Sequence, residues 1–270
     1  MSRILAVGFA CALLGGAVAQ AFEKPPRIFE PCSVILFQGD SITHGGRMSD
    51  MNHFLGHGYQ AEIAMRYLAY RPEDNLQFGN RGESGHTSAD LVKRWNRDAF
   101  PYTADEDGYR GEFGVEKTEL TPDVLSILIG INDYLCEGGH HVEVADFERN
   151  LELMVTNSLA ANPKLRIVLC EPFRLPVDES SEFVRRQKAV RDIAAKYNLA
   201  FVPFQTLFTS LTAIHPRTKY WFWDLFHPTY AAHMRMADFW IETVKKEFAA
   251  GRGRPRGKEP NGDRPPLRAG

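Results

Sequence analysis

The sequence predicts an α/β protein built on a parallel sheet that helices cover on both sides. Five short runs rich in Val, Ile, Leu and Phe are apolar on both faces of a strand, which is typical of strands in a buried parallel sheet. Segments with apolar residues at steps of three and four separate these runs, as expected for amphipathic helices. The length of 270 residues allows one large domain of this kind.

The expected elements alternate along the chain. The strands are predicted at residues 34–37, 76–78, 124–129, 167–170 and 201–204. Two helical stripes are formed by Phe147, Leu151, Met154 and Val155, and by Val190, Ile193, Ala194 and Tyr197. The last stripe is formed by Met234, Ala237, Ile241, Val244 and Phe248. Pro228 is expected in the first turn of that helix, where a missing N–H costs nothing.

Both ends of the chain differ in composition from the domain between them. Residues 1–21 combine Arg3, an apolar run and small residues, the pattern of a cleaved secretory signal, and the run is short for a membrane-spanning helix. An exported protein, periplasmic or extracellular, with a domain over residues 22–249 is therefore predicted. Residues 250–270 are rich in Gly, Pro and Arg and are expected to be a disordered tail. The long insertion at residues 99–120 is a candidate lid or substrate wall, or a surface excursion.

Charge and cysteine content exclude several classes of protein. A formal net charge of -2 and a pI near 6.5 give no field for nucleic acid or an anionic membrane surface. Once the signal is removed, Cys32, Cys136 and Cys170 remain, an odd number that excludes a complete disulfide framework. Cys170 lies in an apolar run and is expected to be a buried thiol.

Neither a metal nor a cofactor is predicted. The chain has no Cys-x-x-Cys pair, so a thiolate zinc site has no support. His53 with His57, and His140 and His141 with Glu143, lack a clear third ligand.

Polar motifs follow the first three predicted strands and precede the last helix. Residues 39–43 read GDSIT, residues 80–87 read NRGESGHT and residues 130–133 read GIND. Because ligands bind beyond the carboxyl ends of parallel strands, these motifs can converge although they are remote in sequence. Asp224 precedes His227 by three residues, so its carboxylate can hold Nδ1 of the ring and leave Nε2 free as a base. Ser41 would complete a set of nucleophile, base and orienting acid.

These four blocks, in this order, resemble the GDSL, or SGNH, hydrolase family. The resemblance implies a flavodoxin-like three-layer α/β/α sandwich with a five-stranded parallel sheet. It also implies that Ser41 is the nucleophile, that Asp224 and His227 complete the triad, and that Asn132 donates to the oxyanion together with the Ser41 amide. The oxyanion glycine maps best to Gly85, with Gly82 as the fallback.

Two features near the motifs bear on this assignment. Ser84 is a rival nucleophile because residues 82–85 half match the G-x-S-x-G elbow, but His86 occupies the position of the final glycine, so that motif fails. The chain also departs from the family in having no Leu after Ser41 and in carrying Glu83 where an apolar residue is common. This departure from the family pattern leaves the substrate class open and does not argue against activity.

The expected substrate is an ester with a small acyl group. Residues 220–223 are aromatic and lead into Asp224, so Trp223 could stack on a sugar or line an acyl groove, or the rings could pack under the last helix. Asp40 and Arg174, the latter expected near the rim, are further candidate substrate-binding residues. The GINDY and EPF segments are similar to those of secreted bacterial acylhydrolases that act on acetylated carbohydrates.

We therefore expect a serine esterase that removes acetyl groups from a glycan or small molecule, with no nucleic-acid partner and no stable membrane insertion after signal cleavage. Alternatives are a lipase-like or lysophospholipase-like esterase and a non-catalytic carbohydrate-binding protein on the same fold. The sequence does not indicate the oligomeric state.

Overall fold

The computed structural model describes residues 24–47, 55–99, 121–135, 141–176 and 181–254. The predicted signal segment, residues 100–120 of the insertion, Cys136, and His53 and His140 lie outside these ranges, so the expectations placed on them stay predictions. No helix among the described residues has the length and apolar character needed to cross a membrane.

A five-stranded parallel sheet forms the centre of the molecule, in the order β2-β1-β3-β4-β5. The strands are β1 (Val34–Gly39), β2 (Gln77–Asn80), β3 (Val124–Leu128), β4 (Arg166–Cys170) and β5 (Ala200–Val202). All five predicted strands are present, each with boundaries shifted by a few residues. Because the order reverses between β1 and β3, the carboxyl ends of these two strands form the switch point at which α/β proteins place their ligand sites.

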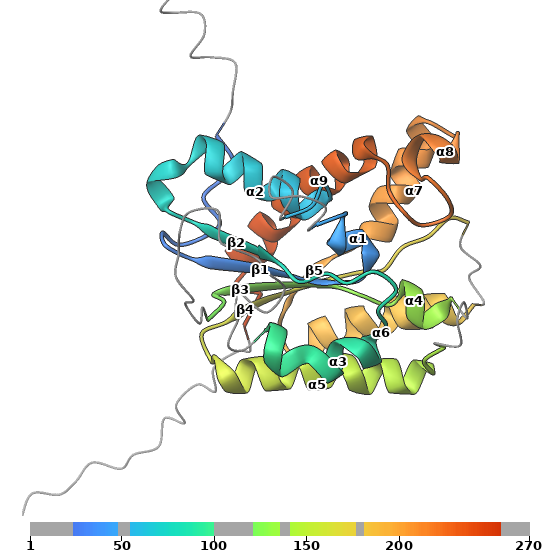
Figure 1. Ribbon diagram of the computed structural model, residues 1–270, viewed down its shortest axis with the longest axis horizontal. Helices are drawn as coiled ribbons and strands as arrows, with labels where there is room; N and C mark the ends of the chain where they lie inside the picture. The colour runs from blue at the N-terminus through green and yellow to red at the C-terminus, as the bar shows by residue number, and fades with distance from the viewer. Residues whose placement is uncertain (1–23, 48–54, 100–120, 136–140, 177–180, 255–270) are drawn as a thin grey trace, which may run out of the picture.

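Helices cover both faces of the sheet, as Figure 1 shows. One face carries α2 (Tyr59–Tyr70), α7 (Phe204–Ile214) and α9 (Tyr230–Ala249). The other carries α3 (Ser88–Asp98), α5 (Val144–Ala161) and α6 (Glu182–Lys196). Short helices α1 (Ser41–His44), α4 (Ile131–Tyr134) and α8 (Thr218–Trp221), with the 3-10 turn Pro72–Asp74, complete the described elements. The predicted three-layer sandwich is confirmed.

The strand side chains divide between two cores because successive residues of a strand point to opposite faces. Ile35 and Phe37 of β1 pack under α2 and α9, whereas Leu36 packs under α3 and α5. Trp240 of α9 is fully buried in the first core, and its Nε1 donates to Ser126 Oγ at 3.2 Å. Apolar side chains therefore cover both faces of the sheet, and the polar residues that follow the strands are left at its edge, where a ligand can reach them.

Three details differ from the sequence-based expectations. Phe204 begins α7 instead of ending the fifth strand. Pro228 lies before α9, and the helix is capped by Thr229, whose hydroxyl accepts from Ala232 N. Met234 is about half exposed. The buried stripe of α9 is formed by Ala232, His233, Met236, Ala237, Trp240, Ile241 and Val244.

The start of the predicted tail is part of the packed structure. Gly253 N donates to Asn198 O at 2.9 Å, and Gly253 O accepts from Ile167 N at 2.8 Å. Residues 250–254 therefore return the chain to the sheet, and the expectation of disorder now concerns residues 255–270, which are not described.

Cys170 is the buried thiol that the apolar run predicts. Its side chain is 1% exposed, and burial raises its pKa to about 12, against weaker opposing hydrogen bonds with Ser126 and Trp240.

Candidate active site

The turn after β1 places Ser41 at the edge of the sheet. Gly39 is required there because a Cβ would lie 2.3 Å from Leu128 O and 2.5 Å from Thr43 Oγ1. Asp40 then caps α1 by accepting from Ile42 N at 3.0 Å. Ser41 follows as the first residue of α1.

Asp40 is buried, with an exposed fraction of 1%, so it is a helix cap beneath the site instead of a substrate-facing group. Burial raises its pKa to about 7; the bond from Ile42 N opposes that rise, and the nearby Asp133 adds to it. The expectation that Asp40 binds substrate finds no contact in the structure that supports it.

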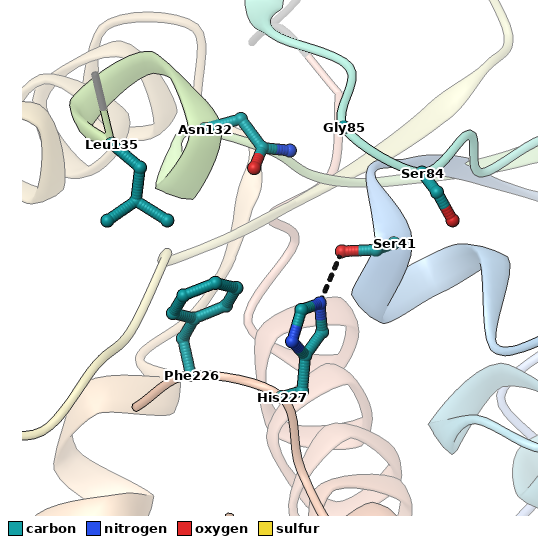
Figure 2. A pocket seen from close by; sticks show the side chains of 7 residues that line it. All are labelled: Ser41, Ser84, Gly85, Asn132, Leu135, Phe226 and His227. Atoms are coloured by element: carbon teal, nitrogen blue, oxygen red, sulfur yellow. Dashed lines mark hydrogen bonds between the residues drawn. The ribbon is translucent and has the colours of Figure 1, made fainter. Parts of the chain in front are cut away.

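Ser41, His227 and Asp224 form one hydrogen-bonded line. Ser41 Oγ lies 2.8 Å from His227 Nε2 across 186 positions of sequence, as Figure 2 shows. His227 Nδ1 lies 2.6 Å from Asp224 Oδ2. The other oxygen of Asp224 accepts from the backbone N–H groups of Phe226 and His227 at 2.9 and 2.8 Å. Partial burial would raise the pKa of Asp224, but these bonds from His227 and the backbone outweigh it and hold the pKa below its usual value.

A hollow of about 360 Å³ opens beside this line. It is lined by Ser41, Ser84, Gly85, Asn132, Leu135, Phe226 and His227 (Figure 2). Asn132 Nδ2 donates one hydrogen to His86 O at 2.9 Å, and a primary amide has a second hydrogen to offer. The Ser84 hydroxyl is directed away from His227, whose ring nitrogen meets Ser41.

The structure separates the two candidate oxyanion glycines. Gly85 lines the hollow with φ +78, and a Cβ there would meet nothing within 4 Å. Gly82 packs against α1, where a Cβ would lie 2.3 Å from His44 N, and its own N–H donates to Asn80 Oδ1 at 2.9 Å. Gly82 is therefore needed for packing, and Gly85 is the glycine that lines the same hollow as Ser41.

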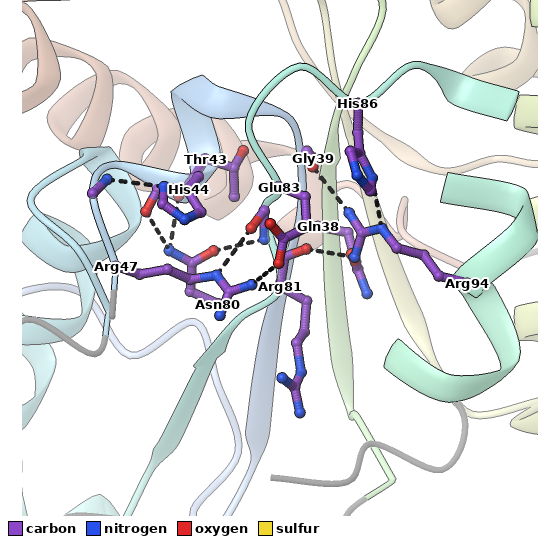
Figure 3. Close-up of polar contacts among 12 residues, drawn as sticks. Gln38, Gly39, Thr43, His44, Arg47, Asn80, Arg81, Glu83, His86 and Arg94 are labelled. Atoms are coloured by element: carbon purple, nitrogen blue, oxygen red, sulfur yellow. Dashed lines mark hydrogen bonds and ion pairs between the residues drawn. The ribbon is translucent and has the colours of Figure 1, made fainter. Parts of the chain in front are cut away.

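Two buried arginines hold the loop that carries Gly85, as Figure 3 shows. Arg94 of α3 donates from Nε to His86 Nδ1 at 3.1 Å and from Nη1 to Arg81 O at 2.8 Å. Arg47 donates from Nε to Gly82 O at 2.9 Å and pairs through Nη2 with Glu83. Glu83, the charge that departs from the family pattern, is thus paired with a buried cation and helps to hold the loop.

Two further polar groups fix the neighbouring motifs. Asn80 Nδ2 donates to Thr43 O at 2.8 Å and Leu55 O at 2.9 Å. Asp133, which follows Asn132, is buried and accepts from Ser88 N at 3.0 Å, so it ties α4 to the start of α3. The sequence did not indicate that Arg47, Arg94 and Asp133 hold the loops of the site in place. Their hydrogen-bond partners lie in other motifs, and only the fold brings these together.

Trp223 and Arg174 lie outside this hollow. Trp223 is 65% exposed and lines a second hollow that also borders Ser41 and His227. The Arg174 guanidinium lies 4.9 Å from the centre of the Tyr134 ring, and Arg174 is not among the residues that line either hollow.

His141 and Glu143 have a third potential metal ligand beside them, Glu182, which the sequence did not indicate. His141 Nε2 lies 3.4 Å from Glu143 Oε1 and 3.6 Å from Glu182 Oε2. Glu182 is already paired with Arg185 and Arg186 at 3.1 and 3.2 Å. The cluster therefore forms an ion-pair network without the excess of negative charge that favours a cation.

Comparisons with known proteins agree with this geometry. The model of the GDSL-like lipase/acylhydrolase family matches residues 37–235. An acetylxylan esterase from Geobacillus stearothermophilus is 30% identical over 236 residues, which cover 81% of this chain and 96% of the relative.

Solved structures of similar proteins share the fold. A Parabacteroides merdae protein described as a GDSL-like lipase has a TM-score of 0.67 and 31% identity, covering 82% of this chain and 99% of that one. A structure of an acetylxylan esterase from Geobacillus stearothermophilus has a TM-score of 0.64 and 29% identity, covering 80% and 95%. An α/β hydrolase from the metagenome of Lake Arreo has a TM-score of 0.66 and 25% identity, covering 81% and 97%. The chain belongs to the GDSL-like lipase/acylhydrolase family and is a carboxylic ester hydrolase.

Proposed function

We propose that this protein is a serine esterase that removes acetyl groups from a carbohydrate through an acyl-enzyme on Ser41. The observation that carries the proposal is the line of hydrogen bonds from Asp224 Oδ2 through the His227 ring to Ser41 Oγ, at 2.6 and 2.8 Å. This arrangement can move a proton off the hydroxyl at the moment it attacks a carbonyl.

Ser41, His227 and Asp224 act in both steps of the reaction, the formation of the acyl-enzyme and its hydrolysis. His227 Nε2 accepts the Ser41 proton as Oγ bonds to the acyl carbon, and then donates it to the departing alcohol oxygen. A water molecule next gives its proton to His227 and attacks the acyl-enzyme, and the proton returns to Ser41 Oγ as the acid leaves. Asp224 keeps Nδ1 protonated and stabilises the charged ring.

The carbonyl oxygen becomes negative in both attacks and is stabilised by donors at the first hollow. The N–H groups of Ser41 and Gly85 and the second hydrogen of Asn132 Nδ2 supply them. Losing one such donor typically raises the barrier by about 2.7 to 4 kcal/mol.

An acetyl ester of a carbohydrate suits the site best. Among the described residues, the side chains that line the first hollow include two large apolar ones, Leu135 and Phe226, which is little surface for a long acyl chain. The 30% identical relative is an acetylxylan esterase. A lipase-like enzyme would need a longer apolar groove than the described residues provide. A non-catalytic binding protein would have no need of a hydroxyl, imidazole and carboxylate in hydrogen-bonded line.

We also propose that residues 1–21 direct export and are removed, so that the enzyme acts in the periplasm or outside the cell. The composition of that segment supports this proposal.

The nucleophile is tested by comparing Ser41→Ala with Ser84→Ala on p-nitrophenyl acetate. Ser41→Ala should lose nearly all activity and all labelling by a fluorophosphonate probe, while Ser84→Ala should keep labelling and most of its turnover. Activity that survives in Ser41→Ala and disappears in Ser84→Ala would reverse the assignment. A clear preference for octanoyl over acetyl esters in the wild type would replace the acetylesterase with the lipase-like alternative.

A further inference from the structure

A second hollow of about 290 Å³ borders the Ser41–His227 pair. Its lining includes Gly45, Gly46, His57, Trp223, Tyr230 and His233. The two hollows share Ser41 and His227 and no other lining residue among those described. An ester whose carbonyl carbon meets Ser41 Oγ thus has separate spaces for its two halves.

The wall of the second hollow is aromatic and uncovered. Trp223 and Tyr230 are 65% and 62% exposed, and their ring centres lie 6.1 Å apart with planes at 88°. His57 meets Tyr230 edge-on with 5.7 Å between ring centres. Large, solvent-exposed rings beside the Ser41 hydroxyl offer apolar area to a ligand that is itself amphipathic.

His233, which also lines this hollow, offers it a hydrogen-bond donor. His233 is 7% exposed, and its Nδ1 accepts from Tyr59 N at 3.1 Å. In a neutral imidazole the proton must then be on Nε2, which has no hydrogen-bond partner among the described residues. Burial, aided by the nearby His57 and His227, lowers the pKa of His233 to about 3, so the ring stays neutral and this tautomer persists at working pH.

The chemistry of the two hollows assigns the halves of the ester. The oxyanion donors and the apolar side chains Leu135 and Phe226 lie in the first hollow, where the carbonyl oxygen and the acyl group belong. His227 Nε2 must reach the departing oxygen, and His227 lines both spaces. We propose that the second hollow binds the alcohol half of the substrate, a hydroxyl-bearing pyranose ring that packs on Trp223 and Tyr230 and accepts a hydrogen bond from His233 Nε2. This inference rests on the esterase function proposed above.

The test compares two acetyl esters that differ only in the alcohol, a mono-O-acetylated methyl xylopyranoside and ethyl acetate. The variants are Trp223→Ala, Tyr230→Ala and His233→Phe. The ratio of kcat/KM for the sugar ester to kcat/KM for ethyl acetate should fall by about tenfold in each, which corresponds to about 1.4 kcal/mol. Tyr220→Ala is the matched control, since Tyr220 is a half-exposed ring of the same segment that stacks on His215 and lines neither hollow. It should keep the wild-type ratio.

Binding without turnover separates this inference from the catalytic assignment. Calorimetric titration of Ser41→Ala with the acetylated xylopyranoside should show binding that is about tenfold weaker when Tyr230→Ala is added. The subsite is overturned if Trp223→Ala and Tyr230→Ala both keep the kcat/KM ratio within about twofold of the wild type and the affinity for the acetylated xylopyranoside within about twofold of Ser41→Ala. An equal fall of the kcat/KM ratio in Tyr220→Ala would also overturn the subsite. So would a fall of this ratio that occurs only in variants whose molecular mass in light scattering differs from that of the wild type. If Ser41→Ala remains fully active while the binding result holds, the nucleophile assignment fails and the subsite stands.

Discussion

Replacing Asn132 by Ala tests the contribution of one proposed oxyanion donor. The side chain lines the first hollow, and its Nδ2 donates to His86 O at 2.9 Å, which leaves one hydrogen for the substrate oxygen. If that hydrogen stabilises the tetrahedral intermediate, its loss raises the barrier by about 2.7 to 4 kcal/mol, or about 10² to 10³ in kcat. KM should change little, because the donor acts mainly on charge that develops after binding.

The same substitution has a small structural cost that can be measured separately. Losing the bond to His86 O should lower the free energy of unfolding by about 0.5 to 1.5 kcal/mol. The loop should keep its place, because Arg94 still holds the His86 ring at 3.1 Å and Arg81 O at 2.8 Å. The catalytic effect is therefore read from kcat and the structural effect from the free energy of unfolding, so the two can be separated.

The assay is steady-state hydrolysis of p-nitrophenyl acetate, paired with urea unfolding. Asn162→Ala is the control. Asn162 Nδ2 donates to Pro122 O at 3.0 Å in the same kind of bond, its Oδ1 also accepts from Lys164 N at 3.0 Å, and the residue lines neither hollow. It should lose similar stability and no activity. A fall in kcat of less than about tenfold in Asn132→Ala, or an equal fall in Asn162→Ala, would refute the donor role.

Two more predictions follow from the histidines. Asp224→Asn should keep the fold and lower kcat by about 10³ to 10⁴, because an amide no longer enforces the Nδ1-protonated ring or stabilises its charge; steady-state kinetics check this, and a loss below about tenfold would contradict it. His233 has a folded pKa of about 3, below the unfolded value of 6.5, so the unfolded chain binds more protons in this window and the free energy of unfolding falls as pH drops from 6.5 to 3. The slope from this one group reaches about 1.4 kcal/mol per pH unit. Asp40 affects the free energy of unfolding in the opposite direction. Its pKa is raised from 3.8 to about 7, so the folded chain binds more protons and the stability that this group contributes is lost as pH rises toward 7. The measurement is therefore the difference in free energy of unfolding between the wild type and His233→Gln across this pH range, and a difference that does not vary with pH would disprove the assignment.

Features that depend on near neighbours could be read from the sequence. The apolar runs predicted all five strands, because burial on both faces leaves a continuous apolar signature. Asp224 and His227 are three positions apart in a turn, and the predicted contact between them has formed at 2.6 Å. The ordered motifs also predicted the family, which the match over residues 37–235 shows.

Packing between remote segments decided the rest. The sequence left Gly82 and Gly85 open, and the structure separates them because α1 fills the space around Gly82. Asp40 was a candidate substrate-binding residue, but its side chain is buried. Glu83, whose charge departs from the family pattern, is paired with Arg47. The sequence could pair Ser41 with His227 only by assuming that their motifs converge at one edge of the sheet, an assumption that the family resemblance supported. Their meeting across 186 positions depends on the strand order and on helices that bring distant loops to one edge, and no local propensity encodes that distance.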